Sequence, residues 1–118
     1  MTVKLNHEAF IHAKQLIESG RVAHDSRDDW SEHAPTTDEE NTFLEKHDWN
    51  EYSKWYLGVD DDMDADTKGH YEFPYGDFAK VHRCAVISGE SRAAQYDHDT
   101  IREALGTLLH QIDEHKAT

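Results

Sequence analysis

Amphipathic helices account for most of the hydrophobic and polar pattern along the chain. Apolar residues recur at helical spacing from Leu5 to Ser19 and again over residues 101–112, the most regular stripe in the sequence. Asn6 is suited to cap the first helix, and the last helix is expected to begin at residues 99–100. The periodic pattern ends near residue 113, so residues 114–118 are predicted to form a loose tail.

The middle of the chain carries signals for two further helices. Thr36 and Glu39 have the spacing of a capping box, which predicts a helix starting at Thr36 or Thr37. A second helix is expected over residues 50–57, because Asn50 can cap it and a glycine follows its bulky apolar residues.

Residues 70–77 are predicted to form a short extended strap. Tyr71, Phe73 and Tyr75 alternate with other residues, which is typical of a strand. Pro74 has no amide hydrogen to donate to a neighbouring strand, so the strap can only lie at the edge of a sheet.

A further helix is expected to begin near Phe78, with Asp77 as its cap, and to continue to Tyr96. Val81 and Ala85 fall on its apolar face. Gly89 is expected to weaken this helix or divide it.

These elements predict a mainly α fold: a single domain over residues 1–118, built as a small bundle of four or five helices with the strap packed across them. The length of 118 residues leaves room for one thin core. The predicted core residues are Phe10, Ile17, Phe43, Trp55, Val81, Ile87, Ile101, Leu105 and Leu108.

Composition narrows the classes of partner. Twenty-five acidic and 12 basic residues give a net charge of −13, which disfavours nucleic acid and anionic membranes. A single cysteine cannot form an internal disulfide, and no apolar run approaches the ~18 residues of a membrane span. With no signal-peptide pattern at the N-terminus, the expected location is cytoplasmic.

Residues 60–68 form an acidic stretch that is interpreted as a solvated loop. Asp60, Asp62 and Asp64 have the spacing of calcium ligands in an EF-hand loop. The glycine expected at the sixth position is Ala65, and Tyr71 stands where a bidentate glutamate is expected. The stretch is therefore not assigned as a calcium site.

A locally cationic and aromatic segment over residues 68–95 is the main functional candidate. Arginine side chains suit phosphate or carboxylate groups, and aromatic rings can stack on a ligand. The candidate ligand-binding residues are Tyr75, Asp77, His82, Arg83, Arg92 and Gln95. This pattern favours a small binding or adaptor protein for a small anionic ligand or a protein partner. The structural alternative is that Arg83 and Arg92 pair with local carboxylates.

Two other functions stay open. The first is a metal-dependent or small-molecule enzyme using His70, Asp77 and His82, with His98 as a further histidine to test. On a helix, His82 and Cys84 would point away from each other, so Cys84 is interpreted as a small buried residue rather than a nucleophile. No catalytic residue, metal ligand or cofactor is assigned.

The second is self-association into a homo-oligomer through exposed aromatic side chains, namely Trp30, Trp49, Trp55 and Tyr56. For Trp30, which lies in a polar stretch predicted as loop, two local roles remain: an anchor for that loop or a lid over a site.

The order of motifs resembles that of a group of short bacterial proteins with no established activity. The motifs are WSEHAP at 30–35, EN at 40–41, YSKWYLG at 52–58, KGHYEFPYGDF at 68–78, VHRC at 81–84 and SRAAQY at 91–96. The likeness covers nearly the whole chain. It implies a family and not a function.

Overall fold

The computed structural model describes residues 3–25 and 30–117 and shows an α/β fold. In chain order, its elements are β1 (Val3–Leu5), α1 (His7–Glu18), β2 (Val22–Ala23), α2 (Trp30–His33), α3 (Thr37–Lys46), α4 (Trp49–Ser53), β3 (Tyr56–Asp60), the 3-10 helix η1 (Lys68–His70), β4 (Tyr71–Pro74), β5 (Val81–His82), α5 (Arg83–Gln95) and α6 (Asp99–Ala117). The predicted mainly α bundle is therefore wrong, because strands pair into two small sheets.

The larger sheet is antiparallel, with the strand order β1-β3-β4. Val3 pairs with Asp60 on one side of β3, and Tyr56 pairs with Pro74 on the other. The predicted strap is thus β4, an edge strand, and the edge position suits its proline. The smaller sheet joins β2 and β5 in parallel, with Ala23 opposite His82.

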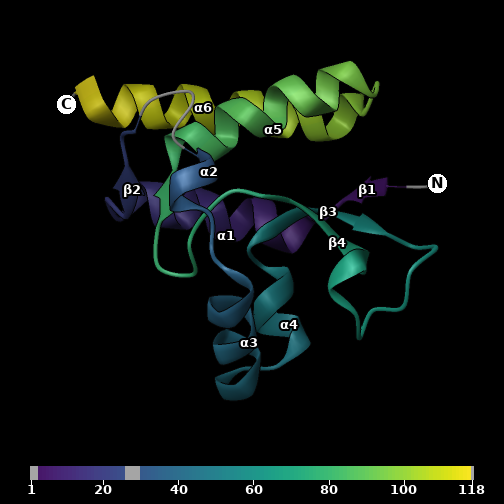
Figure 1. Cartoon of the computed structure of the whole chain (residues 1–118). Helices are drawn as coiled ribbons and strands as arrows, with labels where there is room; N and C mark the ends of the chain where they lie inside the picture. The colour runs from purple at the N-terminus through teal and green to yellow at the C-terminus, as the bar shows by residue number, and fades with distance from the viewer. Residues whose placement is uncertain (1–2, 26–29, 118) are drawn as a thin grey trace.

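Helices α1, α5 and α6 pack against the strands. Figure 1 shows α5 and α6 lying side by side above α1, while α3 and α4 project on the far side of α1. The buried core includes Ile17, Trp55, Val81, Ile101, Leu105 and Leu108 from the predicted list. Phe10 and Phe43 are half-buried against it, whereas Ile87 lies outside the core cluster.

The capping residues in the sequence correctly predicted where two helices begin. The Asn6 side chain accepts a hydrogen bond from the Ala9 amide at the start of α1. Thr36 and Glu39 form the reciprocal capping box at the start of α3. Both cap predictions are confirmed. Caps can be predicted from sequence because they depend on residues within one turn. The last helix runs to Ala117, past the end at residue 113 that the periodicity predicted.

The helix predicted over residues 50–57 is wrong in its second half. Asp48, and not Asn50, caps α4 by accepting a hydrogen bond from the Glu51 amide at 2.9 Å. The chain then enters β3 at Tyr56, where it pairs with strands on both sides. The apolar residues at 56–57 suit a helix or a strand, and pairing with β1 and β4 decides for the strand.

The helix predicted from Phe78 begins five residues later, at Arg83. The Asp77 carboxylate accepts hydrogen bonds from the amides of Ala79 and Lys80 at 3.0 and 2.9 Å, which closes a turn. Phe78 lies in the left-handed region, with φ of 68°, and cannot continue a helix. After that start, α5 runs unbroken through Gly89.

The acidic stretch over residues 60–68 contains turns that aspartate side chains stabilise. Asp60 and Asp64 accept hydrogen bonds from the amides of Asp62 and Asp66, each at 3.0 Å, so these carboxylates brace turns in the acidic loop. Within the described ranges, no helix combines the length and apolar character needed to cross a bilayer.

Candidate functional site

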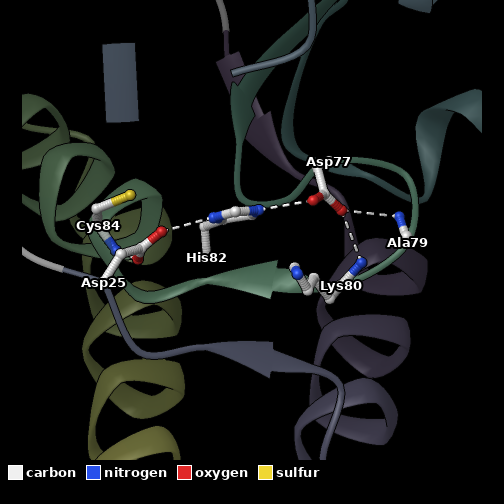
Figure 2. Close-up of polar contacts among 6 residues, drawn as sticks. All are labelled: Asp25, Asp77, Ala79, Lys80, His82 and Cys84. Atoms are coloured by element: carbon white, nitrogen blue, oxygen red, sulfur yellow. Dashed lines mark hydrogen bonds and ion pairs between the residues drawn. The ribbon is translucent and has the colours of Figure 1, made fainter. Parts of the chain in front are cut away.

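Two carboxylates and a thiol lie close to the side chain of His82. This residue ends β5 and precedes α5, and its side chain is only 5% exposed. Its Nδ1 lies 2.6 Å from Oδ2 of Asp25, and its Nε2 lies 2.8 Å from Oδ2 of Asp77. Figure 2 shows the imidazole ring edge-on between the two carboxylates. We refer to Asp25, Asp77, His82 and Cys84 as the polar cluster.

Asp25 reaches the site because it follows β2, the strand paired with β5. Its Oδ1 accepts a hydrogen bond from the Cys84 amide at 2.9 Å, which satisfies a free N–H in the first turn of α5. Burial would raise the pKa of the Asp25 carboxyl, but hydrogen bonds from Cys84 and His82 outweigh burial and hold the pKa below its ordinary value.

Asp77 holds the other side of the ring. One carboxylate oxygen accepts from the amides of Ala79 and Lys80, and the other faces His82 (Figure 2). Burial opposes ionisation here too, yet the hydrogen bonds from His82 and the two amides lower the pKa of Asp77. Both carboxyl groups are therefore held in the ionised form.

The two carboxylates define the state of the histidine between them. An ionised carboxylate can only accept hydrogen bonds, so both ring nitrogens of His82 must donate. A ring that donates from both nitrogens is an imidazolium. The arrangement is thus a buried cation between two anions, with charge-assisted hydrogen bonds on both sides.

Cys84 brings a sulfur atom to the same place. Its side chain is fully buried, as the sequence predicted, but its neighbours are polar. One ligand atom each from Asp25, His82 and Cys84 lie within 4.8 Å of one another. The expectation that His82 and Cys84 point apart assumed that both lie in a helix, whereas His82 is in a strand.

Aromatic rings cover the cluster. The Trp30 ring centroid lies 5.6 Å from that of His82, and the His33 ring stacks on His82 at 5.4 Å. Both residues belong to α2, in a stretch predicted to be loop. Trp30 thus lies against the polar cluster, and the contact fits both of its predicted roles, an anchor for the loop and a lid over a site.

The structure separates most of the predicted ligand-binding residues. Tyr75 is fully buried, so its ring offers no face to a ligand. Arg83 forms a two-point ion pair with Asp113, with Nε 2.8 Å from Oδ1. Arg92 and Gln95 are exposed, further along α5. Among the side chains of these six residues, the described structure joins only those of Asp77 and His82.

The other histidines proposed for a metal site lie in different surroundings. His70 has Nδ1 2.9 Å from the carbonyl oxygen of Met63, and its ring is edge-on to Tyr71. His98 makes an edge-on contact with Phe73. The polar cluster instead draws on Asp25, which the sequence did not single out.

Asp25 was missed because it is separated from His82 by 57 positions, and no local spacing links them. The one available signal was the segment VHRC, in which a histidine and a cysteine flank the start of a helix.

Comparison of the chain with family models, curated proteins and solved structures gives no match.

Proposed function

We propose that the protein binds a zinc ion through Asp25, His82 and Cys84. The observation that supports this proposal is the convergence of carboxylate oxygen, imidazole nitrogen and thiol sulfur within 4.8 Å. Zinc binds all three ligand types, with bonds of about 2.0–2.3 Å. Tetrahedral ligand atoms then lie about 3.5 Å apart, which small side-chain rotations can reach from this arrangement.

Asp77 supplies the outer support that zinc sites require. A zinc-bound histidine usually donates its second ring N–H to a carboxylate, which fixes the ring and strengthens the ligand. His82 already has this geometry, since Nε2 lies 2.8 Å from Asp77 while Nδ1 faces Asp25 and the cysteine. The proposal keeps His82 of the predicted enzyme site as a ligand and Asp77 as its outer support, and it does not use His70.

The charges also balance. Zinc binding would displace two protons: the Nδ1 proton directed at Asp25 and the Cys84 thiol proton. A dication replaces two single positive charges, so the net charge of the buried cluster is unchanged. Three protein ligands leave one position of a tetrahedral ion for water or another ligand.

The test is a titration of the purified full-length protein with Co²⁺ and then Zn²⁺. Tetrahedral cobalt bound to thiolate should give visible bands and a sulfur-to-cobalt charge-transfer band, and Zn²⁺ should remove both at one equivalent. The variant C84S, which nearly preserves side-chain shape, should lose the charge-transfer band. Absence of stoichiometric binding by the folded wild-type protein would exclude the proposal.

Two variants separate direct from supporting roles. H70Q should bind zinc as the wild type does, because His70 lies outside the polar cluster. D77N should keep the charge-transfer band while its zinc affinity falls about 10–100-fold. If H70Q abolishes binding and C84S does not, the metal lies at the set predicted from sequence and the proposal is wrong.

A further inference from the structure

A second candidate site is a cavity of about 320 Å³ that is lined by β4, α5 and Trp30. This volume suits a small molecule rather than a macromolecule. The α5 wall consists of Ala85, Ser88, Gly89 and Arg92, which recur at the spacing of one helix face. Three small residues in a row on that face make room for a ligand, and the arginine follows them.

The opposite wall carries a carboxylate with an unsatisfied oxygen. Glu72 of β4 lines the cavity, and its Oε2 is buried without a hydrogen-bond partner among the residues that the structure describes. Buried polar atoms are almost always hydrogen-bonded, because a missing partner destabilises the folded state. The atom therefore lacks a donor in this conformation, and a ligand ammonium group in the cavity would supply one once the Glu72 side chain turns toward it.

The backbone beside Glu72 is held in an unusual conformation. Phe73 has φ of 60°, in the left-handed region that non-glycine residues rarely adopt. A regular strand sends successive side chains to opposite faces, yet residues 71–74 all line this cavity. Such strain persists only where the surrounding structure enforces it, and it concentrates at ligand sites.

The glycine opposite this strand makes the conformation feasible. Gly58 pairs with Glu72, and a Cβ placed on Gly58 would lie 2.9 Å from the Phe73 ring. The Phe73 ring thus occupies the space that a side chain at position 58 would need.

Arg92 gives the cavity a second charge of opposite sign. Its guanidinium lies 6.0 Å from the centre of the Tyr96 ring, and within the described ranges it forms no ion pair. A guanidinium binds a carboxylate through two parallel hydrogen bonds. The remaining lining is mostly apolar, and its aromatic residues are Trp30, Tyr71 and Phe73.

We propose that this cavity binds a small zwitterion with an apolar body, of the type of an aliphatic amino acid. Its ammonium group would donate to Glu72, its carboxylate would accept from Arg92, and its apolar part would lie against Trp30 and Phe73. The site does not depend on zinc, although Trp30 borders both the cavity and the polar cluster.

The test uses three matched compounds with the wild-type protein in isothermal titration calorimetry. Leucine carries both charges, 3-methylbutylamine lacks the carboxylate, and 4-methylpentanoate lacks the amino group. Leucine should bind at least about tenfold more tightly than either analogue, because each analogue leaves one charged group of the cavity unpaired. Equal binding of leucine and 4-methylpentanoate, or no binding of leucine at millimolar concentration, would overturn the proposal.

Two variants assign the charges. E72Q should remove the preference for leucine over 4-methylpentanoate, and R92Q should remove the preference for leucine over 3-methylbutylamine. R102Q is the matched control, because Arg102 lies on α6 outside this cavity and should leave binding unchanged. Leucine affinity that is unchanged in E72Q would place the ligand elsewhere.

The result also stands apart from the zinc proposal. Cobalt titration of E72Q should match that of the wild type, since Glu72 is not part of the polar cluster. If Glu72 and Arg92 simply close on each other in solution, no compound binds and the zwitterion proposal is wrong, whatever the metal result.

Discussion

His82 is buried and His12 is half-buried, and the two rings have opposite surroundings. His82 lies between two carboxylates, whereas His12 of α1 has Nδ1 2.9 Å from the Tyr75 hydroxyl and its ring edge-on to Trp55. Burial lowers the pKa of His12 and favours its neutral form. The comparison teaches that burial alone does not decide the charge of a histidine, because the more deeply buried ring is the one held between two carboxylates.

The contact at His12 is part of a short hydrogen-bonded chain. The Tyr75 hydroxyl donates to the Lys54 carbonyl at 2.6 Å, so its oxygen accepts the Nδ1 proton of a neutral imidazole. This chain ties α1 to the segment between α4 and β3 without any ionised group. The polar cluster ties β2, β5 and the turn at Asp77 together through charge.

The largest expected effect comes from removing each ring in turn. H82A should lower the free energy of unfolding by about 3–5 kcal/mol, because it leaves two partly buried carboxylates facing each other without a cation. H12A should cost about 1–2 kcal/mol, since it removes one neutral hydrogen bond and some packing. Urea unfolding measured by circular dichroism gives both values.

The control for this pair is H110A, since His110 is exposed and, among the residues that the structure describes, pairs with Glu114 on the same helix. Its effect should stay within about 0.5 kcal/mol. Equal losses for H82A and H12A would show that the two carboxylates do not hold His82 as an ion.

The second expected effect concerns the hydroxyl of Tyr75. Y75F should lower the free energy of unfolding by about 1–3 kcal/mol, because the Lys54 carbonyl and the His12 ring each lose a buried partner. Thermal unfolding measures the loss. Since the residue is buried, binding of zinc and of leucine should not change; a variant with wild-type stability and impaired ligand binding would instead support the ligand-contact role predicted for Tyr75 from sequence.

A smaller effect should appear in the pH dependence of stability. Burial is the main cause that lowers the pKa of His12 below its ordinary value of about 6.5, and the charges of Lys54 and Glu51 act on it in opposite directions. The unfolded chain therefore takes up this proton at a higher pH than the folded chain. The contribution of His12 to folded stability must therefore decrease as the pH drops below about 6.5.

The variant H12Q isolates that contribution. Its unfolding free energy should fall less than that of the wild type between pH 7.5 and pH 5.5, while the other histidines contribute equally to both proteins. Urea unfolding curves at the two pH values measure the difference. Parallel losses in the two proteins would mean that His12 is not held neutral.

The smallest expected effect is at Arg83, whose charge is exposed in contrast to that of His82. Its pair with Asp113 has two contacts but lies at the surface, so R83A should cost less than about 1 kcal/mol. A double-mutant cycle with D113A measures the coupling. A loss as large as that of H82A would show that this surface pair stabilises α5 against α6 more than its exposure allows.

What the sequence predicted well was local. The caps at Asn6 and Thr36 depend on neighbours within a few positions, and the amphipathic stripe of α6 reports its own buried face. What it could not predict was non-local. Residues 56–60 form a strand because partners from both sides of the sequence pair with them, and residues 81–82 do so because β2 lies alongside.

The candidate site follows the same division. His82 and Asp77 were selected because both are chemically active and close in sequence, and the structure brings them into contact. Asp25 is one of 25 acidic residues, and only the pairing of β2 with β5 distinguishes it. Glu72 was not selected either, because its unsatisfied oxygen is a property of packing and not of spacing.

The placement of the three tryptophans makes the molecule its own optical reporter. Trp30 lies against His82, Trp55 against His12 and Tyr75, and Trp49 is stacked on Tyr71. Replacing two of the three by phenylalanine leaves a single fluorophore that senses one neighbourhood. Emission from the three resulting proteins would show whether those neighbourhoods melt together or one after another, without any attached dye.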